Sequence, residues 1–191
     1  MTAEAVDGRR AKGERRRALL LEAALRVVER DGVAGVTHRA VAKEAGQPPS
    51  SATYYFESID DLLVAALVRS VDAYAARLRE ATESPDPVAA LAETLAAELA
   101  RGRAPVIAEY ELYLLAARRP ALRATAQRCV DDLAALARRC TGDPVAVKAF
   151  CACVDGLLLQ ALVTGASPDA SGIEAVLRLA MAGSEPAGGV P

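Results

Sequence analysis

Prolines divide this chain into segments that favour helices. Pro87, Pro105, Pro120 and Pro144 each stand where a new helix should begin, because proline fits the first helical turn and disrupts a helix interior. The 191 residues are 52% hydrophobic but only 4% aromatic, so the apolar content is mostly Ala, Leu and Val. Ala and Leu are strong helix formers, and the alternation typical of strands is absent. The sequence therefore predicts an all-α protein.

Helix-start and helix-stop signals predict nine helices arranged in two parts. Residues 1–13 are predicted to form a disordered basic arm, and residues 14–57 to form three short helices. Residues 58–183 are predicted to form a six-helix bundle, whose last helix starts at the capping box Ser171-Gly-Ile-Glu174. Residues 184–191 are rich in Pro and Gly and are predicted to be a disordered tail.

The second and third helices are short and flank a tight break. Thr37 is a good N-cap for the second helix, which ends at Ala45-Gly46. Pro48-Pro49 then starts a third helix that ends near Tyr55, before the capping box Ser58-Ile-Asp-Asp61 opens the fourth. Helices this short are not stable alone in water. The arrangement indicates a helix-turn-helix whose third helix enters the DNA major groove. The alternative is a three-helix packing unit with a Pro-Pro linker.

The residues around this break suit contact with DNA. The start of the second helix carries free N–H groups and partial positive charge, which can bind a phosphate. Small residues let the third helix approach the bases, its hydroxyls can meet base edges, and tyrosine can contact a phosphate or a thymine methyl. The predicted DNA-binding residues are Thr37, His38, Arg39, Lys43, Pro49, Ser50, Ser51, Thr53, Tyr54 and Tyr55.

The charge distribution indicates a polyanion partner for one end of the chain. The net charge is -2. Residues 1–56 hold ten Lys/Arg against seven Asp/Glu (+3), and residues 57–191 hold thirteen against eighteen (-5). A basic N-terminal part on an acidic body suggests that only the N-terminal part binds a polyanion. Within it, the run Arg15-Arg16-Arg17 can either contact DNA or form a solvated helix start.

Three motifs resemble the N-terminal domain of the TetR-type transcriptional repressors. They are VTHRAVAKEAG (36–46), YYF (54–56) and SIDDLL (58–63), and the likeness is closest to an actinobacterial-style branch with THRAVA and TYYF. Thr53 and Ile59 depart from the family pattern, in which Tyr and Lys are usual, so one customary phosphate contact is missing. The resemblance implies a repressor that binds a palindromic operator and is released by a small-molecule effector.

The resemblance also implies a homodimer formed through the last two helices. The helix from about residue 144 to residue 165 is apolar nearly all round, so it must be covered on more than one side. The alternative is a helix buried within a monomeric core. Two reading helices about one DNA turn (~34–36 Å) or more apart would require a palindromic operator. The predicted dimer-interface residues are Phe150, Val154, Leu157, Leu158, Ala161 and Leu162.

An effector pocket in the middle of the bundle is a further implication of the resemblance. Polar side chains stand among aliphatic residues in several of its helices, and buried polar atoms need a partner, a water or a ligand. The predicted effector-site residues are Tyr74, Glu109, Tyr110, Tyr113 and Gln160. Alternatively, the tyrosines belong to the core and Glu111 pairs with Arg118 or Arg123. The effector is expected to favour a form in which the fourth helix moves the reading helices out of register.

The four cysteines allow two interpretations. Cys129, Cys140, Cys151 and Cys153 are predicted to be small buried apolar residues in a reducing compartment. The alternative is a regulator that responds to thiol oxidation across helices. One histidine in the chain makes a metal site unexpected, and no cofactor is predicted. Without a phosphate-binding loop or a catalytic triad arrangement, the sequence does not indicate an enzyme.

The sequence also bears on location and on a second class of function. No apolar run approaches the roughly 20 residues that span a bilayer, and the polar N-terminus argues against a signal peptide. These features predict a cytoplasmic protein without membrane contact. The remaining alternative is a helical protein-interaction module without DNA binding, which would show no salt-dependent affinity for duplexes.

Overall fold

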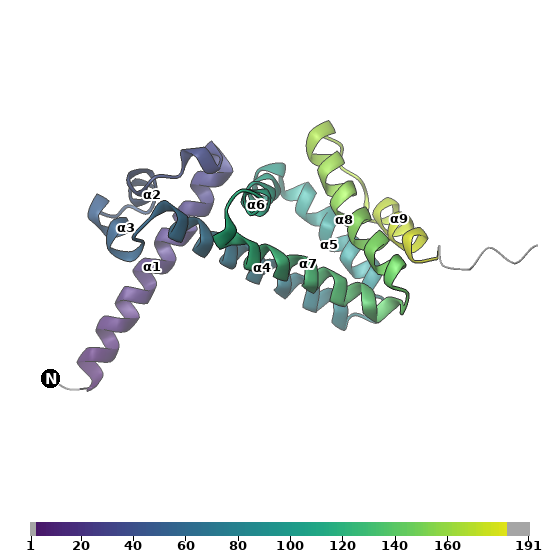
Figure 1. The fold of residues 1–191 in the computed structure, drawn as a ribbon, viewed down its shortest axis with the longest axis horizontal. Coiled ribbons are helices and arrows are strands. Elements are labelled where there is room, and N and C mark those ends of the chain that lie inside the picture. Colours follow the sequence, from purple (N-terminus) through teal and green to yellow (C-terminus); the bar gives the residue numbers. More distant parts are fainter. Residues whose placement is uncertain (1–2, 183–191) are drawn as a thin grey trace, which may run out of the picture. The chain divides into compact units, whose positions relative to one another are not determined.

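The computed structural model describes residues 3–182, with side chains from residue 11 onward. This part of the chain contains nine α-helices, one short 3-10 helix and no strand (Figure 1), which confirms the all-α prediction. The predicted disordered tail, residues 184–191, lies outside the described residues. The elements are α1 (Ala3–Asp31), η1 (Val33–Gly35), α2 (His38–Glu44), α3 (Pro49–Tyr55), α4 (Ile59–Glu83), α5 (Pro87–Arg101), α6 (Arg103–Leu115), α7 (Pro120–Cys140), α8 (Pro144–Thr164) and α9 (Ala170–Ala182).

Contacts divide the chain into two compact units that interleave along the sequence. The first consists of Met1–Ser70 and Ile107–Thr125, and the second of Val71–Val106 and Ala126–Pro191. This division differs from the predicted boundary after residue 57. The first unit also takes in the start of α4, most of α6 and the start of α7.

α1 starts much earlier than the sequence indicates. It begins at Ala3, whereas the sequence predicts disorder over residues 1–13. Among the described side chains, which start at residue 11, the buried face of α1 begins at Leu20 and continues through Ala24 and Val27, all fully buried. The N-terminal half of α1 extends beyond α2 and α3 (Figure 1). The helix is therefore anchored at its C-terminal half, which packs against α2.

Local capping signals place α2 and α4 where the sequence predicts them. The Ala40 N–H donates to Thr37 Oγ1 over 3.0 Å, which caps α2. Val36 and Val41, on either side of this cap, are both buried, as expected for a hydrophobic staple. At α4 the capping box closes in both directions: the Asp61 N–H donates to Ser58 Oγ and the Ser58 N–H donates to Asp61 Oδ2, each over 3.0 Å.

The prolines mark helix starts in the second half of the chain, with one exception. Asp86 caps α5 and Asp143 caps α8, each one residue before a proline in the first turn. α7 starts at Pro120. α6, however, starts at Arg103, so Pro105 lies within its first turn and does not open it. Proline is tolerated there because the first N–H groups of a helix have no partner inside the helix.

The N-cap of α9 is a different residue from the predicted one. Asp169, and not Ser171, caps this helix: the Gly172 N–H donates to Asp169 Oδ1 over 2.7 Å, and the Ser171 hydroxyl donates to the same atom. Both hydrogen bonds favour the ionised carboxylate, so the pKa of Asp169 lies below its usual value, the Gly172 N–H being the larger cause. The preceding Asp competes for the cap because a carboxylate is a stronger acceptor than a hydroxyl.

α9 completes the core of the second unit. It packs against α5 and α8. Each fully buried aliphatic or aromatic side chain there contributes about 1.5–3 kcal/mol to folding relative to an exposed one. These residues include Leu91, Leu95, Phe150, Ile173 and Leu177.

Candidate nucleic-acid interface and effector site

α2 and α3 pack against each other across a tight turn. Gly46 sits at the turn with a φ of 62°, which favours glycine, and the Gln47 N–H donates back to the Ala42 carbonyl over 2.9 Å. Ala52 and Phe56 are buried. The inner side of α3 is thus fixed by packing, and the outer side is free to face solvent.

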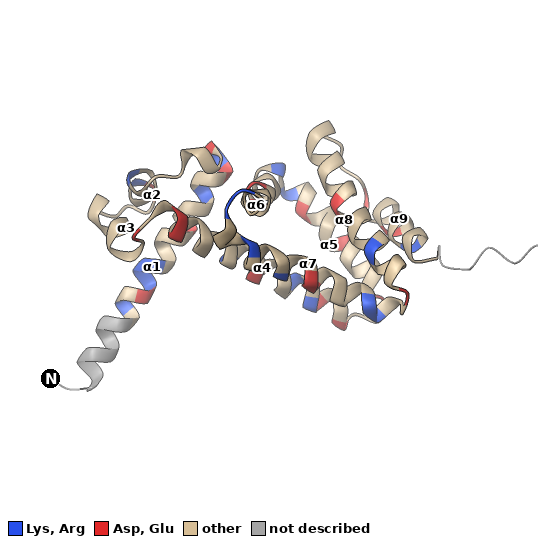
Figure 2. Ribbon diagram, in the orientation of Figure 1, with Lys and Arg blue, Asp and Glu red and all other residues tan. Residues whose placement is uncertain are grey.

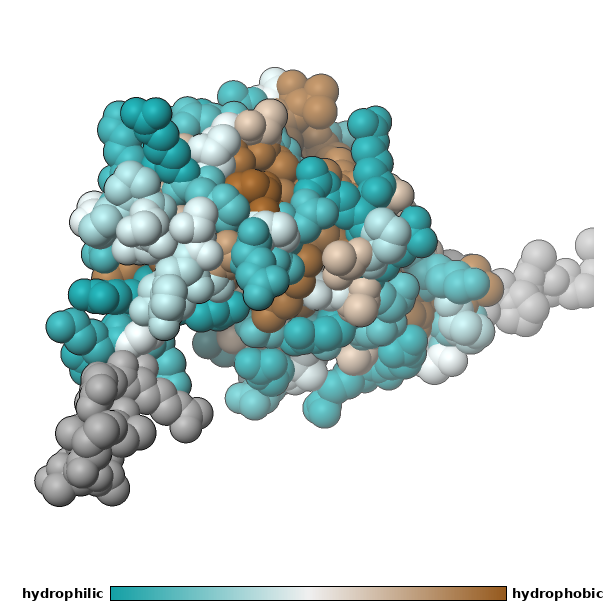
Figure 3. Space-filling view, turned by 60° about the vertical axis from the view of Figure 1, so that its left-hand side comes forward, coloured by the Kyte–Doolittle hydropathy of each residue, from teal (hydrophilic) through white to brown (hydrophobic). Residues whose placement is uncertain are grey.

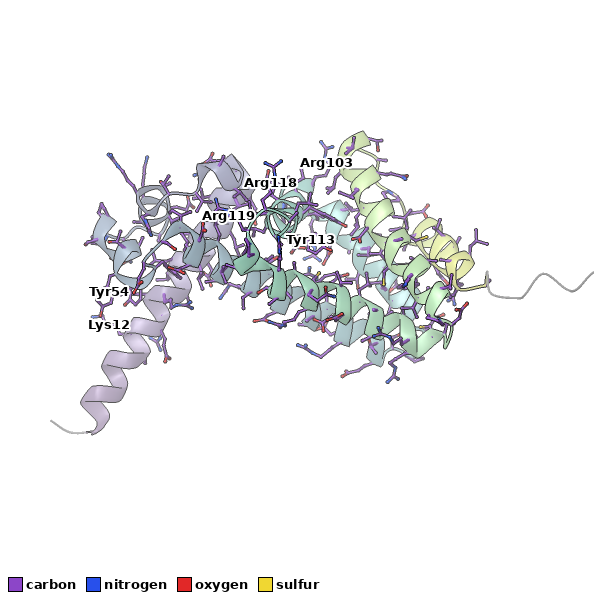
Figure 4. The ribbon with its side chains drawn as sticks, in the orientation of Figure 1. Lys12, Tyr54, Arg103, Tyr113, Arg118 and Arg119 are labelled. Atoms are coloured by element: carbon purple, nitrogen blue, oxygen red, sulfur yellow. The ribbon has the colours of Figure 1, made fainter. Side chains whose placement is uncertain are left out.

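Most of the predicted residues of α3 lie on that outer side. Pro49, Ser50, Thr53 and Tyr54 are exposed, while Ser51 and Tyr55 are half-buried. Tyr54 has 81% of its surface exposed and points away from α3 into solvent in Figure 4. Its ring lies 5.0 Å from that of Tyr55 in an edge-to-face arrangement, which restrains both side chains.

The predicted residues of α2 divide into two kinds. Thr37 and His38 have partners within the protein: Thr37 caps α2, and His38 Nε2 lies 3.0 Å from the Phe56 carbonyl oxygen. A carbonyl only accepts, so Nε2 carries the proton in this contact. The bond ties the start of α2 to the end of α3, a structural role that the sequence did not reveal. Arg39 and Lys43 are exposed.

Acidic groups near α2 are largely engaged by arginines of α1. Glu44 accepts from Arg26 Nε over 2.8 Å and from Arg30 Nη1 over 2.7 Å. These contacts lower the pKa of Glu44, the hydrogen bond from Arg26 contributing most. By contrast, Lys12, Arg15, Arg16, Arg39 and Lys43 form no ion pair with any residue that the structure describes. Their charges remain available to an anionic partner.

The predicted effector residues of α6 belong to the first unit. Glu109, Tyr110 and Tyr113 are half-buried, and the two tyrosine rings are 6.4 Å apart, edge to face. Glu111 between them is half-buried too, and its Oε2 accepts a hydrogen bond from the Val33 N–H over 2.6 Å. The suggested pairing of Glu111 with Arg118 or Arg123 is therefore wrong, since the backbone of η1 provides the partner.

In the second unit, Tyr74 belongs to a cluster that the sequence did not reveal. The guanidinium of Arg77 lies 5.5 Å from the centre of the Tyr74 ring and also pairs with Glu98 of α5. Burial raises the pKa of Glu98 by more than the neighbouring charge of Arg77 lowers it. The available signal was a lone carboxylate, Glu98, in the apolar stretch LAAELA (95–100). Gln160, also predicted for the effector site, is exposed.

A cavity of about 350 Å³ also lies in the second unit, between α4 and α7. No predicted effector residue lines it. Its walls mix apolar side chains with both signs of charge. The lining residues are Ala75, Leu78, Arg79, Thr82, Glu83, Asp132, Ala135, Leu136 and Arg139.

The predicted dimer-interface residues of α8 differ in their exposure within the subunit. Phe150, Val154, Leu158 and Ala161 are buried in the subunit itself, and Leu157 and Leu162 are half-buried. The buried side chains lie in the core of the second unit, where α8 packs against α9.

Another side of α8 and α9 exposes apolar side chains, with the charged residues Lys148 and Asp155 among them on α8. On α8, Val145, Ala152, Leu159 and Val163 recur at helical spacing, with Val163 84% exposed. On α9, Val176 and Leu179 are exposed, Leu179 to 72%. We call these six residues the α8–α9 apolar face. Apolar patches also interrupt the hydrophilic surface on the face of the molecule drawn in Figure 3.

By length and composition, α8 is apolar enough to span a membrane. It is the one helix of this kind among the described residues. A single helix of this kind is weak support for a membrane span, because a core helix passes the same test.

None of the four cysteines is fully buried, contrary to expectation. Cys129, Cys151 and Cys153 are half-buried, Cys140 is exposed, and none of the four forms a disulfide. Burial raises the pKa of both Cys140 and Cys151, with smaller increases from the charges of Asp86 and Asp155 respectively. A higher pKa keeps the thiol protonated and slows oxidation. Within residues 3–182, no group of three His, Cys, Asp or Glu is placed to hold a metal ion.

Known protein families match both parts of the chain. Residues 20–66 match the family model for bacterial regulatory proteins of the tetR family, and residues 83–183 match the tetracyclin repressor-like C-terminal domain. No curated protein matches the chain.

Solved structures similar to the chain include two that cover most of it. A member of the TetR family from Streptomyces coelicolor A3 is 41% identical, with a TM-score of 0.75, over 86% of this chain and 97% of that one. The multidrug binding protein EbrR, complexed with imidazole, is 39% identical, with a TM-score of 0.74, over 91% and 92% of the two chains. EbrR was also solved with ethidium and with proflavin.

Proposed function

Because this chain belongs to the TetR family of transcriptional regulators, we propose that it is a cytoplasmic repressor that binds a palindromic operator as a homodimer. A small-molecule effector releases it from DNA. Members of this family regulate transcription and are not enzymes, which agrees with the absence of a catalytic motif in the sequence.

The observation that carries this proposal is the exposure of the outer side of α3. Tyr54 is 81% exposed while Ala52 and Phe56 on the same helix are buried. A helix held by its inner side and presenting hydroxyls outward can enter a groove about 12 Å wide. Arg39 and Lys43, exposed on α2, supply phosphate contacts that fix its position.

The α8–α9 apolar face supports the homodimer. A two-fold interface uses the same surface on both subunits, and exposed apolar side chains on a pair of packed helices are typical of such contacts. Small residues assist close approach: Ala152 and the half-buried Gly156 lie on the same side of α8 as Leu159 and Val163. This face takes the place of the residues that the sequence suggested.

An organic cation with aromatic rings is the effector class that we propose. EbrR, at 40% identity, was solved with ethidium and with proflavin, which are flat aromatic cations. Such ligands are bound by aromatic faces and carboxylates. The chain offers these groups as Tyr74 and Glu98 in the second unit, and as Glu109, Tyr110 and Tyr113 on α6. The guanidinium of Arg77 is itself a flat cation, and it contacts both an aromatic ring, that of Tyr74, and a carboxylate, that of Glu98.

The raised pKa values of Cys140 and Cys151 argue against the thiol-responsive alternative. The remaining alternative is a helical protein-interaction module that does not bind DNA.

Selection of bound sequences from a randomised duplex library tests the function. We expect a palindrome to be recovered, with affinity that falls steeply as salt rises. Tyr54→Ala and Ser51→Ala should change which bases are preferred, while Arg39→Ala should weaken all duplexes about equally. A protein that recovers no sequence and shows no salt-dependent affinity would be an interaction module. Ethidium should lower operator affinity. Glu98→Gln in the second unit and Tyr113→Ala in the first should be measured separately, and the variant that weakens the response identifies the unit that binds the cation.

A further inference from the structure

We propose that the N-terminal half of α1 is a second DNA-contacting element, in which Lys12 and Arg16 bind backbone phosphates beside the base pairs that α3 reads. This inference rests on the proposed DNA-binding function and adds a contact surface to it. It replaces the expectation of a disordered arm with a helix whose charged groups have fixed positions.

The core of the first unit does not account for this half of the helix. α1 is continuous from Ala3, yet among its side chains from residue 11 onward the first fully buried one is Leu20. Lys12, Arg15 and Arg16 are all exposed. The helix therefore projects past the domain that anchors it (Figure 1), and packing against that domain does not explain the basic side chains along it.

Two contacts place this part of α1 beside α3. A Cβ on Gly13 would lie 3.7 Å from the hydroxyl oxygen of Tyr55, so the two helices approach closely there. The guanidinium of Arg17 lies 5.1 Å from the centre of the Phe56 ring, directly after the last residue of α3. Arg17 is thus held by the domain, and Gly13 marks the side of α1 that faces α3.

Lys12 and Arg16 are the basic residues next to that side. They are four positions apart, so they share one flank of α1, and each directly neighbours a residue that faces α3. Figure 4 shows Lys12 and Tyr54 projecting into solvent from α1 and α3 on the same side of this unit. Arg15 lies on the opposite side of the helix by its spacing from Gly13.

The acidic groups of the first unit leave the side chains of Lys12 and Arg16 available to bind a phosphate. Its acidic groups are mostly engaged within the fold: Glu22 pairs with Arg69, Glu44 with Arg26 and Arg30, and Asp60 with Arg119. Lys12 and Arg16 form no ion pair with any described residue. Figure 2 shows Lys and Arg, together with acidic residues, on the part of α1 that it colours. An unpaired cation beside the reading helix suits a phosphate, and a phosphate contact carries no base preference.

The double variant Lys12→Ala/Arg16→Ala tests the inference. Removing one phosphate contact reduces the slope of log affinity against log salt by about 0.9. Because the variant removes two, we expect the slope to fall by about 1.8 per bound subunit, on the selected operator and on an unrelated duplex alike. The sequence preference found by library selection should stay the same. Hydroxyl-radical footprints should lose protection at the backbone flanking the bases read by α3.

Two controls separate the possible results. Arg101→Ala/Arg138→Ala removes two exposed basic residues of the second unit and should leave the slope unchanged. Lys12→Arg/Arg16→Lys keeps both charges and should bind like the wild type, whereas circular dichroism shows whether the alanine variant keeps its helices. An unchanged slope in a folded alanine variant would overturn the inference alone. A wild-type protein without salt-dependent DNA binding would overturn the proposed function instead.

Discussion

The carboxylate of Glu111 on α6 accepts a hydrogen bond from the backbone N–H of Val33, with 2.6 Å between Oε2 and N. Val33 opens η1, the turn between α1 and α2, so this contact attaches α6 to the connection that positions the helix-turn-helix. The two residues are 78 positions apart in the chain. The carboxylate also lies over Gly32, where a Cβ would approach Glu111 Oε2 to 3.2 Å.

Glu111→Ala should destabilise the first unit. The variant leaves the half-buried Val33 N–H without its charged acceptor, which costs about 1–3 kcal/mol. Urea denaturation gives the free energy of unfolding, and amide hydrogen exchange at Val33 reports the bond directly. Glu111→Gln keeps an acceptor oxygen and should retain most of the protection. Equal exchange rates in the wild type and the alanine variant would mean that the bond does not form in solution.

Gly32→Ala should have a related effect through a different cause. Gly32 has a φ of 72° and a ψ of 174°, a conformation that is nearly restricted to glycine and costs other residues about 1–3 kcal/mol, and the added methyl would press on the Glu111 carboxylate. We expect a lower free energy of unfolding than for the wild type. In the double variant with Glu111→Ala the steric part should vanish, so the two losses should be less than additive. Strict additivity in a double-mutant cycle would refute the contact.

Val163→Glu on the α8–α9 apolar face should dissociate the proposed homodimer. Two-fold symmetry places two new carboxylates in one apolar interface, and their desolvation should raise the dimer Kd roughly 100-fold or more. Sedimentation equilibrium measures this constant. Leu114→Glu, at a residue 58% exposed on α6, provides the matched control and should leave the oligomeric state unchanged. A Val163→Glu protein that stays dimeric would exclude this face.

The stability of the protein should depend on the protonation of Glu98. Its pKa is raised in the folded state by burial, so the folded protein binds this proton more tightly than the unfolded chain. The wild type should therefore lose stability relative to Glu98→Gln as pH rises from the ordinary Glu value of about 4.3 to the raised pKa. Above that pKa the difference should be constant. Urea denaturation between about pH 4 and pH 8 tests this. The prediction is contradicted if the free energy of unfolding of the wild type rises relative to that of the variant as pH rises.

Cys140 and Cys151 should react slowly with alkylating reagents at neutral pH. Their raised pKa values leave less thiolate than the ordinary Cys pKa of about 8.5 allows. Mass spectrometry after iodoacetamide treatment should show modification several-fold slower than in the urea-unfolded protein, and faster as pH rises. Rapid modification of either thiol in the folded protein at pH 7 would return the thiol-responsive alternative to consideration.

Local signals in the sequence determined where most of the helices begin and which side of α3 faces solvent. Thr37 and Ser58 cap their helices as predicted, α5 and α8 start at the predicted Pro87 and Pro144, and the alternation of exposed and buried residues along Pro49–Tyr55 follows from helical spacing. These features depend on residues within a few positions of one another, so the sequence alone is sufficient to predict them. The family motifs lie in the same short stretch.

Only the tertiary structure decided which polar groups meet and which apolar faces stay open. Glu111 could have paired with an arginine nearby in sequence, but the fold brings the Val33 N–H to it. Arg77 and Glu98 meet because α4 and α5 pack together, and Phe150 is buried inside the subunit while Val163 is exposed. A helix that is apolar on several sides does not specify which side its own chain will cover. That choice depends on packing between elements far apart in sequence, and helical periodicity carries no information about it.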